Sequence, residues 1–190
     1  MKTQKKRKIL KVEPLPVITL GHSILRKVAK KVRKPTDHKI KELAEQMIAT
    51  IKSFNGVGIA APQVNHSLRI IVIASTPTPA YPSAPKMKPL VMINPRFVWK
   101  SKRVVKGWEG CGSLLGVRAE IMRSFEVEIA YQDLNGSECR INLTGLPARV
   151  AQHEVDHLNG IMFIDYVGTE DLVSDKYVTE LFKKEVSRKR

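Results

Sequence analysis

The chain has 190 residues, 43% of them hydrophobic, which is enough to build one domain around a single sizeable core. Its formal net charge of +15, from 33 basic and 18 acidic residues, makes nucleic acid or another polyanion a candidate partner. Much of this charge lies at the two ends, where solvated tails that aid solubility are the alternative explanation. The basic residues at the ends are Lys2, Lys5, Lys6, Arg7, Lys8 and Lys11, and Lys183, Lys184, Arg188, Lys189 and Arg190.

Composition also argues against several classes of protein. The two cysteines, Cys111 and Cys139, lie in very different local contexts, which argues against a disulfide framework and favours a reducing compartment. The basic opening lacks the apolar segment of a secretory signal, and its Lys-rich composition is unlike that of a transit peptide. The longest apolar run, residues 70–74, is far shorter than the roughly 20 residues of a membrane span. We therefore expect a cytoplasmic protein outside the membrane.

The first predicted element is a long amphipathic helix. Apolar residues follow helical spacing over residues 40–51, and Thr36 or Asp37 could cap the start. The helix should end near residues 53–55. The following segment, residues 56–63, is too rich in glycine for a helix interior.

Strands are expected to dominate the middle of the chain. Residues 69–74, rich in Ile and Val, predict a buried strand, and residues 76–89, with five prolines, predict a surface loop. Residues 90–94 predict another strand. Residues 125–132 and 138–143 predict a hairpin joined by an Asn-Gly turn.

Two helices are expected to complete the chain. Residues 146–158 predict a helix that stops at Asn159-Gly160, and a second helix should start near Asp171 and run through Leu181 and Phe182. Strands and helices do not alternate regularly. This order favours an α+β architecture over a doubly wound parallel sheet.

The most informative pattern is His-Glu-x-x-His on the first of these two helices. His153 and His157 would lie on one helical face roughly 6 Å apart, so both imidazoles could reach one metal. Glu154 would lie beside the open coordination position, where it could take a proton from metal-bound water. A chance helix with exposed or core histidines is the alternative explanation.

A catalytic metal usually has three protein ligands, so a third ligand is needed. The extended zincin pattern would place a histidine at position 163, but this chain has Phe163 there. Glu170 or Glu180 could be nominated, although neither lies in a supporting local pattern. Cys111 is the better candidate, because glycines on both sides would let the backbone approach a metal closely.

Three segments in this order resemble the signature motifs of the peptide deformylase family. They are Gly-Val-Gly-Ile-Ala-Ala-Pro-Gln (residues 56–63), Glu-Gly-Cys-Gly-Ser (residues 109–113) and Gln-His-Glu-Val-Asp-His (residues 152–157). The three together are highly specific. The resemblance runs from about Pro16 to about Tyr166 and leaves the two basic ends outside it.

The resemblance implies the chemistry of the site. Cys111, His153 and His157 would ligate one divalent metal, and Glu154 would act as general acid and base. A site of one thiolate and two imidazoles accepts Fe(II), Zn(II), Co(II) or Ni(II), since availability as much as affinity decides occupancy. The family is known for Fe(II) in cells, so iron is named first. The substrate would be an N-formyl-methionyl nascent peptide, cleaved to formate and a free amino terminus.

Further residues receive roles from the same resemblance. The side-chain amide of Gln63 and the backbone N–H of Gly112 would stabilise the developing oxyanion. Val57, Gly58 and Gly110 would bind the substrate, the first two by strand-like backbone pairing.

The remaining expectations concern side chains that support the site, line its pocket or pack in the core. Arg118 would support the second motif through Glu109, although such a pair is often only a surface ion pair. Leu146 and Val150 share a helical face with His153 and could line a methionine pocket, although core packing alone would explain them about as well. Cys139 should be a small packed side chain.

This chain departs from the family pattern in its second motif. The usual sequence is Glu-Gly-Cys-Leu-Ser, commonly followed by Val-Pro, whereas here Gly112 replaces the leucine and Leu114-Leu115 occupy the next two positions. A metallo-amidase for a different N-acyl group is therefore one alternative. A non-catalytic ribosome-binding paralogue is another, but a structural metal site would not need Glu154 and would normally have a fourth protein ligand.

The expected fold is that of peptide deformylases, a single α+β domain of antiparallel sheets around a central metal-binding helix. Residues 1–12 would form a basic extension, residues 13–168 the catalytic domain and residues 169–190 a basic C-terminal helix. By resemblance, this helix would contact ribosomal RNA and proteins near the nascent-chain exit. We expect a monomer.

Overall fold

The computed structural model describes residues 12–77 and 84–188 and shows two antiparallel sheets with three helices. One sheet has five strands in the order β1-β2-β3-β6-β7, and the other has three in the order β4-β5-β8. The α+β class is therefore confirmed. The strands are β1 (Gly58–Ala60), β2 (Ile70–Ile73), β3 (Leu90–Lys100), β4 (Val104–Cys111), β5 (Leu114–Ser124), β6 (Glu126–Gln132), β7 (Glu138–Thr144) and β8 (Val173–Ser174). The helices are α1 (His38–Ser53), α2 (Gly145–Leu158) and α3 (Asp175–Arg188), with 3-10 turns at η1 (Ser23–Arg26), η2 (Ala61–Val64), η3 (Phe163–Tyr166) and η4 (Thr169–Asp171).

Helix α1 forms as its pattern predicts. The Asp37 carboxylate accepts a hydrogen bond of 3.0 Å from the backbone N–H of Lys39, so Asp37 is the cap of the two candidates, Thr36 and Asp37. The buried side chains include Leu43, Met47 and Ile51, which recur at helical spacing on one face. This face packs against β1 and β2 in one of the two main core clusters.

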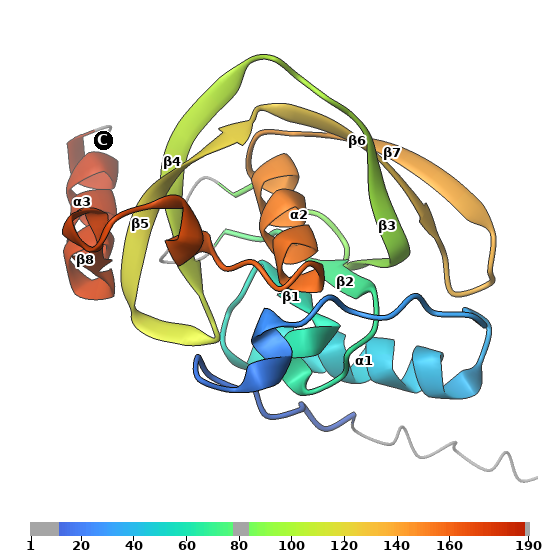
Figure 1. The fold of residues 1–190 in the computed structure, drawn as a ribbon. Helices are drawn as coiled ribbons and strands as arrows, with labels where there is room; N and C mark the ends of the chain where they lie inside the picture. Colours follow the sequence, from blue (N-terminus) through green and yellow to red (C-terminus); the bar gives the residue numbers. More distant parts are fainter. Residues whose placement is uncertain (1–11, 78–83, 189–190) are drawn as a thin grey trace, which may run out of the picture.

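Helix α2 lies at the centre of the molecule, with strands of both sheets around it (Figure 1). Pro147 is in the first turn, where the lack of an N–H costs little, and the helix ends before Gly160, whose φ of +74° is left-handed. Most of its side chains are buried, including both histidines of the motif. The polar side chains of a helix that is buried on nearly all sides need hydrogen-bond or charge partners, because burial without them is costly.

The β4–β5 hairpin is the main element that the sequence analysis did not predict. It pairs Val104 with Ser124 and continues to Cys111 and Leu114 at its turn. Its strands alternate poorly in polarity because two arginines of β5, Arg118 and Arg123, are both buried. Strand β3 is also longer than expected, since it continues past residue 94 through two register irregularities.

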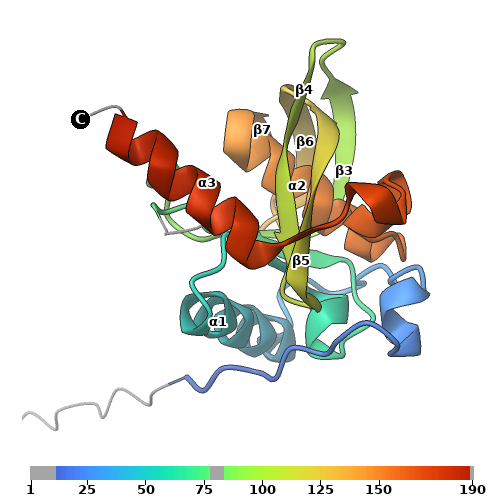
Figure 2. The same ribbon diagram turned by 90° about the vertical axis from the view of Figure 1, so that its left-hand side faces the viewer.

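The C-terminal helix starts later than predicted. Strand β8 pairs with Val117 and Arg118 of β5, so the chain is extended at residues 173–174 and α3 begins at Asp175, not near Asp171. Helix α3 then extends away from the sheets (Figure 2). The side chains from Lys184 onward, the basic residues 2–11 and residues 78–83 of the Pro-rich loop lie outside the described residues. No helix in the described parts of the chain is long and apolar enough to cross a membrane.

Candidate active site

Two elements bring a thiol and two imidazoles together. Helix α2 carries His153 and His157 one turn apart, and Cys111 lies at the end of β4 where the hairpin turns. The ligand atoms of the three residues all lie within 4.8 Å of one another, and Cys111 Sγ is 3.3 Å from His157 Nε2. Sulfur with two nitrogens is a donor set that suits a divalent transition metal and leaves a coordination position for water. The three residues therefore fit a metal centre.

The other nominated ligands lie apart from this group. The ring of Phe163 stacks on His153 with centroids 6.2 Å apart, so position 163 supports the imidazole by packing. Glu170 and Glu180 are exposed, and neither belongs to the cluster of potential metal ligands among the described residues.

A buried carboxylate orients the first histidine. Glu109 Oε2 lies 2.9 Å from His153 Nδ1, which leaves Nε2 as the nitrogen directed to the metal site. Such a carboxylate fixes the ring and raises its basicity as a ligand. Burial alone would raise the pKa of Glu109, but hydrogen bonds with His153 and Arg123 hold this pKa well below its usual value. The carboxylate is therefore charged.

Two arginines neutralise Glu109, and neither was predicted. Arg123 donates from Nε and Nη2 to the two carboxylate oxygens at 2.9 and 3.0 Å. Arg149 Nη1 donates to Glu109 Oε1 at 2.9 Å, and the same guanidinium donates to the backbone carbonyls of Val105, Gly107 and Ile121. The sequence carried one signal for this network. Arg149 lies four residues before His153, on a buried helical face where a cation requires a carboxylate partner.

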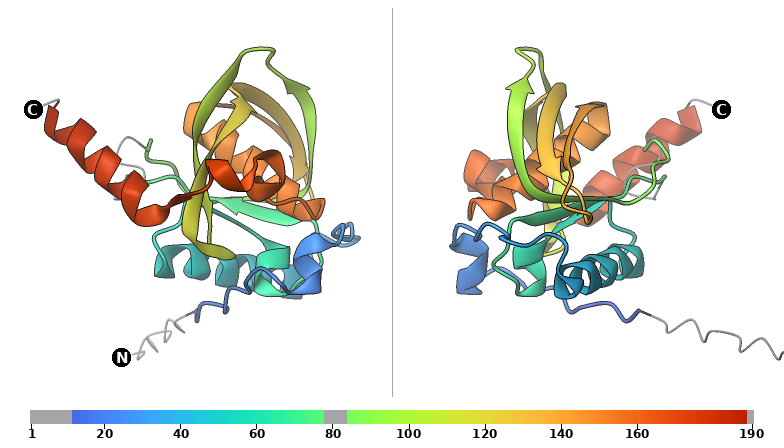
Figure 3. Two further views of the ribbon diagram at one scale, coloured as in Figure 1. Left: turned by 60° about the vertical axis from the view of Figure 1, so that its left-hand side comes forward. Right: turned by 90° about the vertical axis from the view of Figure 1, so that its right-hand side faces the viewer.

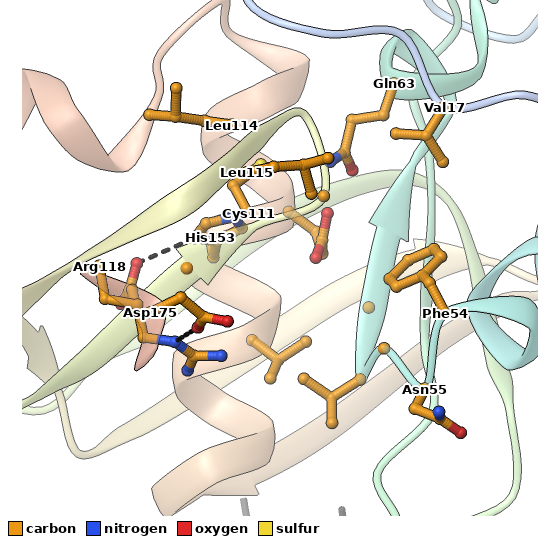
Figure 4. Close-up of a pocket in the computed structure, with 18 of the residues that line it drawn as sticks. Val17, Phe54, Asn55, Gln63, Cys111, Leu114, Leu115, Arg118, His153 and Asp175 are labelled. Atoms are coloured by element: carbon orange, nitrogen blue, oxygen red, sulfur yellow. Dashed lines mark hydrogen bonds and ion pairs between the residues drawn. The ribbon is translucent and has the colours of Figure 1, made fainter. Parts of the chain in front are cut away.

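The prediction that Arg118 supports Glu109 needs correction. Arg118 forms an ion pair with Asp175, the first residue of α3, and the supporting cations of Glu109 are Arg123 and Arg149. The reason is strand geometry. On β5, Arg118 and Arg123 are five residues apart, an odd separation, and side chains at such positions point to opposite faces unless the pairing is irregular. Arg118 lines the pocket beside the site (Figure 4).

Neighbouring groups shift the pKa values of two of the three candidate ligands, Cys111 and His153. Burial alone would raise the pKa of the Cys111 thiol, but the charge of His157 and hydrogen bonds with His153 and His157 hold it well below its usual value. Burial would lower the pKa of His153, but hydrogen bonds with Cys111 and Glu109 hold it well above its usual value. The thiolate is thus favoured, which is the form of cysteine that binds metals.

Glu154 is buried in a tight position beside the ligands. Its Oε2 is buried without a hydrogen-bond partner among the described residues, and burial raises the pKa of the carboxyl group to about 7. A Cβ at Gly58 would lie 2.4 Å from Glu154 Oε1 and 2.6 Å from Val150 Cγ1. Only glycine at position 58 therefore leaves room for Glu154 in this conformation.

Gln63 reaches the site from η2. Its Oε1 accepts a hydrogen bond of 2.8 Å from the Ala60 N–H, which fixes the orientation of the amide. Its Nε2 then points toward the site and lies 3.4 Å from Cys111 Sγ and 3.3 Å from Ser113 Oγ. The sequence analysis assigned no role to Ser113, whose hydroxyl helps to hold this amide.

The site opens into a pocket of about 430 Å³, a size that suits a small ligand or a peptide end. Val57, Gly58, Gly110, Leu146 and Val150, all expected to bind substrate, line it. Val150 also belongs to a core cluster, and Leu146 packs against it. Both residues therefore contribute to the core as well as to the pocket wall.

Gly112 lines the pocket next to Val17 and Phe54. A Cβ at Gly112 would lie 3.7 Å from Val17 and 3.8 Å from the ring of Phe54, which is ordinary contact. Its φ is not among the positive values of this chain. Figure 4 shows Val17 and Phe54 together on this side of the pocket. Position 112 can therefore accept a side chain without strain.

Comparison with known proteins gives consistent results in sequence and structure. The family model described as polypeptide deformylase matches residues 14–172. "Peptide deformylase 2" of Nostoc sp. (strain PCC 7120) is 43% identical over 173 residues, which cover 90% of this chain and 97% of the relative. A class I type b peptide deformylase from Acinetobacter baumannii, solved with Met-Ala-Ser bound, has a TM-score of 0.80 at 42% identity and covers 83% of this chain and 100% of its own. The peptide deformylase from Thermotoga maritima has a TM-score of 0.73 at 35% identity, with coverage of 82% and 99%.

The Glu109 network generates a stability prediction. Arg149→Met should lower the free energy of unfolding by roughly 3 to 5 kcal/mol, because it leaves a buried carboxylate short of one cation and three carbonyls short of a donor. Urea denaturation at neutral pH measures the change. Lys106→Met is the control, since its ion pair with Glu120 is exposed and should contribute less than about 1 kcal/mol. An equal decrease in the free energy of unfolding of the two variants would contradict the prediction.

Proposed function

The chain belongs to the peptide deformylase family, and on this premise we propose how its own residues carry out the reaction. It is a hydrolase of protein biosynthesis that removes the N-formyl group from N-formyl-methionyl nascent peptides, giving formate and a free amino terminus. The family is metal-dependent, and Cys111, His153 and His157 form a group that could bind a metal. We assign these three residues as the ligands.

The observation that carries the mechanism is the position of Glu154, which is buried beside the ligands and has one oxygen without a hydrogen-bond partner in the described part of the chain. A bound divalent metal supplies Lewis acidity, which acidifies water and polarises a carbonyl group. Glu154 accepts a proton from the attacking water as the water oxygen bonds to the formyl carbon. It then delivers this proton to the amide nitrogen as the C–N bond breaks, so that formate and the free amine leave.

Two donors are assigned to the oxyanion that forms during attack. Gln63 supports this role because its Nε2 points toward the site and its Oε1 is already occupied by the Ala60 N–H. The backbone N–H of Gly112 is the second donor, next to the ligand Cys111. Fixed donors of this kind contribute most when they meet charge that develops only in the transition state.

The peptide is proposed to bind along β1. This strand is at the edge of the five-stranded sheet, because it pairs with β2 on one side only, and it borders the pocket. Val57 O already accepts a hydrogen bond from Ala74 N, but the outer edge at Val57 and Gly58 is available for an added strand. Gly110 would line the other side, and Leu146 and Val150 would contact the methionine. The bound Met-Ala-Ser of the Acinetobacter baumannii protein also begins with methionine.

Metal identity, location and partners complete the proposal. We name Fe(II) first, with Zn(II), Ni(II) and Co(II) as the other metals that this donor set accepts. A cytoplasmic monomer is proposed. Residues 1–12, 13–168 and 169–190 are retained as the basic extension, the catalytic domain and the C-terminal segment, although β8 joins the last of these to β5.

The missing side chain at Gly112, which lines the pocket, favours one second candidate, a metallo-amidase for a larger N-acyl group. In the family's usual motif a leucine would occupy this wall beside Val17 and Phe54. Its absence leaves the wall of the pocket open next to the reacting position.

Single substitutions should separate metal binding from turnover. Cys111→Ala, His153→Ala and His157→Ala should each abolish tight binding of one metal equivalent, because each removes a ligand. Glu154→Gln should retain the metal and lose most turnover, because the amide cannot accept the proton. Metal analysis and formyl-peptide hydrolysis of anaerobically prepared Fe(II) protein measure both. Near-normal turnover of Glu154→Gln would reject the mechanism.

Gly112→Leu should raise turnover a few-fold. The substitution keeps the N–H, fits the backbone and removes roughly 0.5 to 1 kcal/mol of chain entropy from the loop. The kcat values of both proteins on formyl-Met and acetyl-Met peptides, compared at equal metal occupancy, measure the effect. A wild-type protein active only on the larger acyl group would favour the second candidate.

Helix α3 is proposed to bind the ribosome near the nascent-chain exit. Lys183 is exposed on it, and its sequence adds Lys184 and Arg188, so RNA phosphates are suitable targets. Truncation after Leu181 should weaken cosedimentation with ribosomes, and binding of the full chain should fall as salt rises. If ribosome binding does not depend on salt, or if the chain does not bind ribosomes at all, the proposal is rejected and the basic ends are explained as solvated tails.

A further inference from the structure

A second concentration of positive charge lies on the folded part of the chain, away from both basic ends. The segment between η1 and α1 contains Lys30, Lys31, Arg33 and Lys34, all exposed, around Val32, which is 4% exposed. We call residues 30–34 the basic segment. Val32 is anchored in the core cluster under α1, so its charged neighbours are directed outward.

The backbone of the basic segment is fixed by hydrogen bonds. Asn94 accepts at Oδ1 from the Val32 N–H at 2.8 Å and donates from Nδ2 to the Val32 carbonyl at 2.9 Å. Lys30 donates its N–H to Ser67 O and accepts at its carbonyl from Arg69 N–H, at 3.0 and 2.8 Å. These cations therefore occupy a preorganised surface, which reduces the ordering cost of binding.

Hollows flank the basic segment on both sides. One is lined by the segment itself with Lys39, His66 and the start of α1, and the other by Lys31 with Arg69 and Arg96. Two acidic residues face them. Asp37 lines the first hollow but caps α1, and Glu138 lines the second. None of the four cations of the segment forms an ion pair within the described residues.

We propose that the basic segment and its two hollows bind the phosphate backbone of double-helical RNA. The charge is complementary to phosphate, and Lys and Arg side chains are the usual donors to it. Among residues 12–77 and 84–188, His66 is the one aromatic residue that lines the hollows, which argues against stacking on single-stranded bases and against insertion into a membrane. Recognition of an RNA duplex depends on shape and phosphates and does not require such residues.

This surface is distinct from α3 and from the pocket. In Figure 1 the N-terminal end of α1, where the basic segment ends, lies at the opposite side of the molecule from α3, and Figure 3 shows the same separation from other directions. Residues of the two hollows do not line the candidate active site. Loss of RNA binding at this surface would therefore leave hydrolysis of a short formyl peptide intact.

A triple substitution in the full-length protein tests the proposal. Lys31→Ala/Arg33→Ala/Lys34→Ala keeps Val32 and Asn94, so the fixed backbone is retained. Affinity for an RNA duplex of about 16 base pairs, measured by fluorescence anisotropy, should fall roughly tenfold or more near 0.1 M salt. The slope of log K against log salt should become less negative by about 2 to 3, since three phosphate contacts are lost.

The matched control removes the same charge elsewhere. Lys100→Ala/Lys102→Ala/Lys106→Ala changes three cations of β3, β4 and their connection and should leave affinity and slope near wild-type values. Both triple variants should hydrolyse a short formyl peptide at the wild-type rate, which also reports correct folding. Equal weakening by the two variants, or an unchanged salt slope in the first, would overturn the proposal. So would a first variant that loses binding to phosphatidylserine vesicles but keeps its affinity for RNA.

Discussion

The candidate active site depends on one buried charge, the carboxylate of Glu109. It joins three elements, because β4 supplies the carboxylate, β5 supplies Arg123, and α2 supplies both Arg149 and His153. Removal of one partner from such a cluster leaves an uncompensated charge in a low-dielectric interior, which is far more costly than loss of a surface pair. The same interactions that hold the hairpin against α2 therefore place Cys111 and the histidines within reach of one metal.

Two glycines near the site have opposite physical roles. Gly58 is required by close approach, since any side chain there would meet Glu154 and Val150. Gly112 is not required in this way, because a Cβ has normal contacts with Val17 and Phe54. The first glycine thus allows the proposed proton carrier to lie against β1. The second leaves part of the pocket wall open and is the feature through which acyl preference could differ from that of relatives.

The charge of +15 is distributed over more than the two ends. Asn94, whose own φ of +52° is left-handed, holds the backbone of the basic segment at Val32 and thereby turns exposed lysines and arginines into a fixed surface. A tail pays a larger entropy cost to order the same number of cations. The basic segment is consequently a positive region of its own, on the opposite side of the molecule from α3.

The sequence by itself determined the α+β class, helices α1 and α2, the Asn-Gly hairpin and the cluster of Cys111, His153 and His157. The fold class, the two helices, the hairpin and the pair His153 and His157 follow from local periodicity, turn chemistry and the short spacing of the motif. Cys111 lies on another element, and the glycines beside it and the family resemblance identified it. It did not determine the β4–β5 hairpin, the start of α3 at Asp175 or the arginines that neutralise Glu109. Two buried arginines, Arg118 and Arg123, give β5 the sequence of a polar segment. The two arginines that neutralise Glu109, Arg123 and Arg149, are 14 and 40 residues away from it in sequence. Only the tertiary structure decides such pairings, because a buried ion pair is specified by which elements meet and not by local sequence.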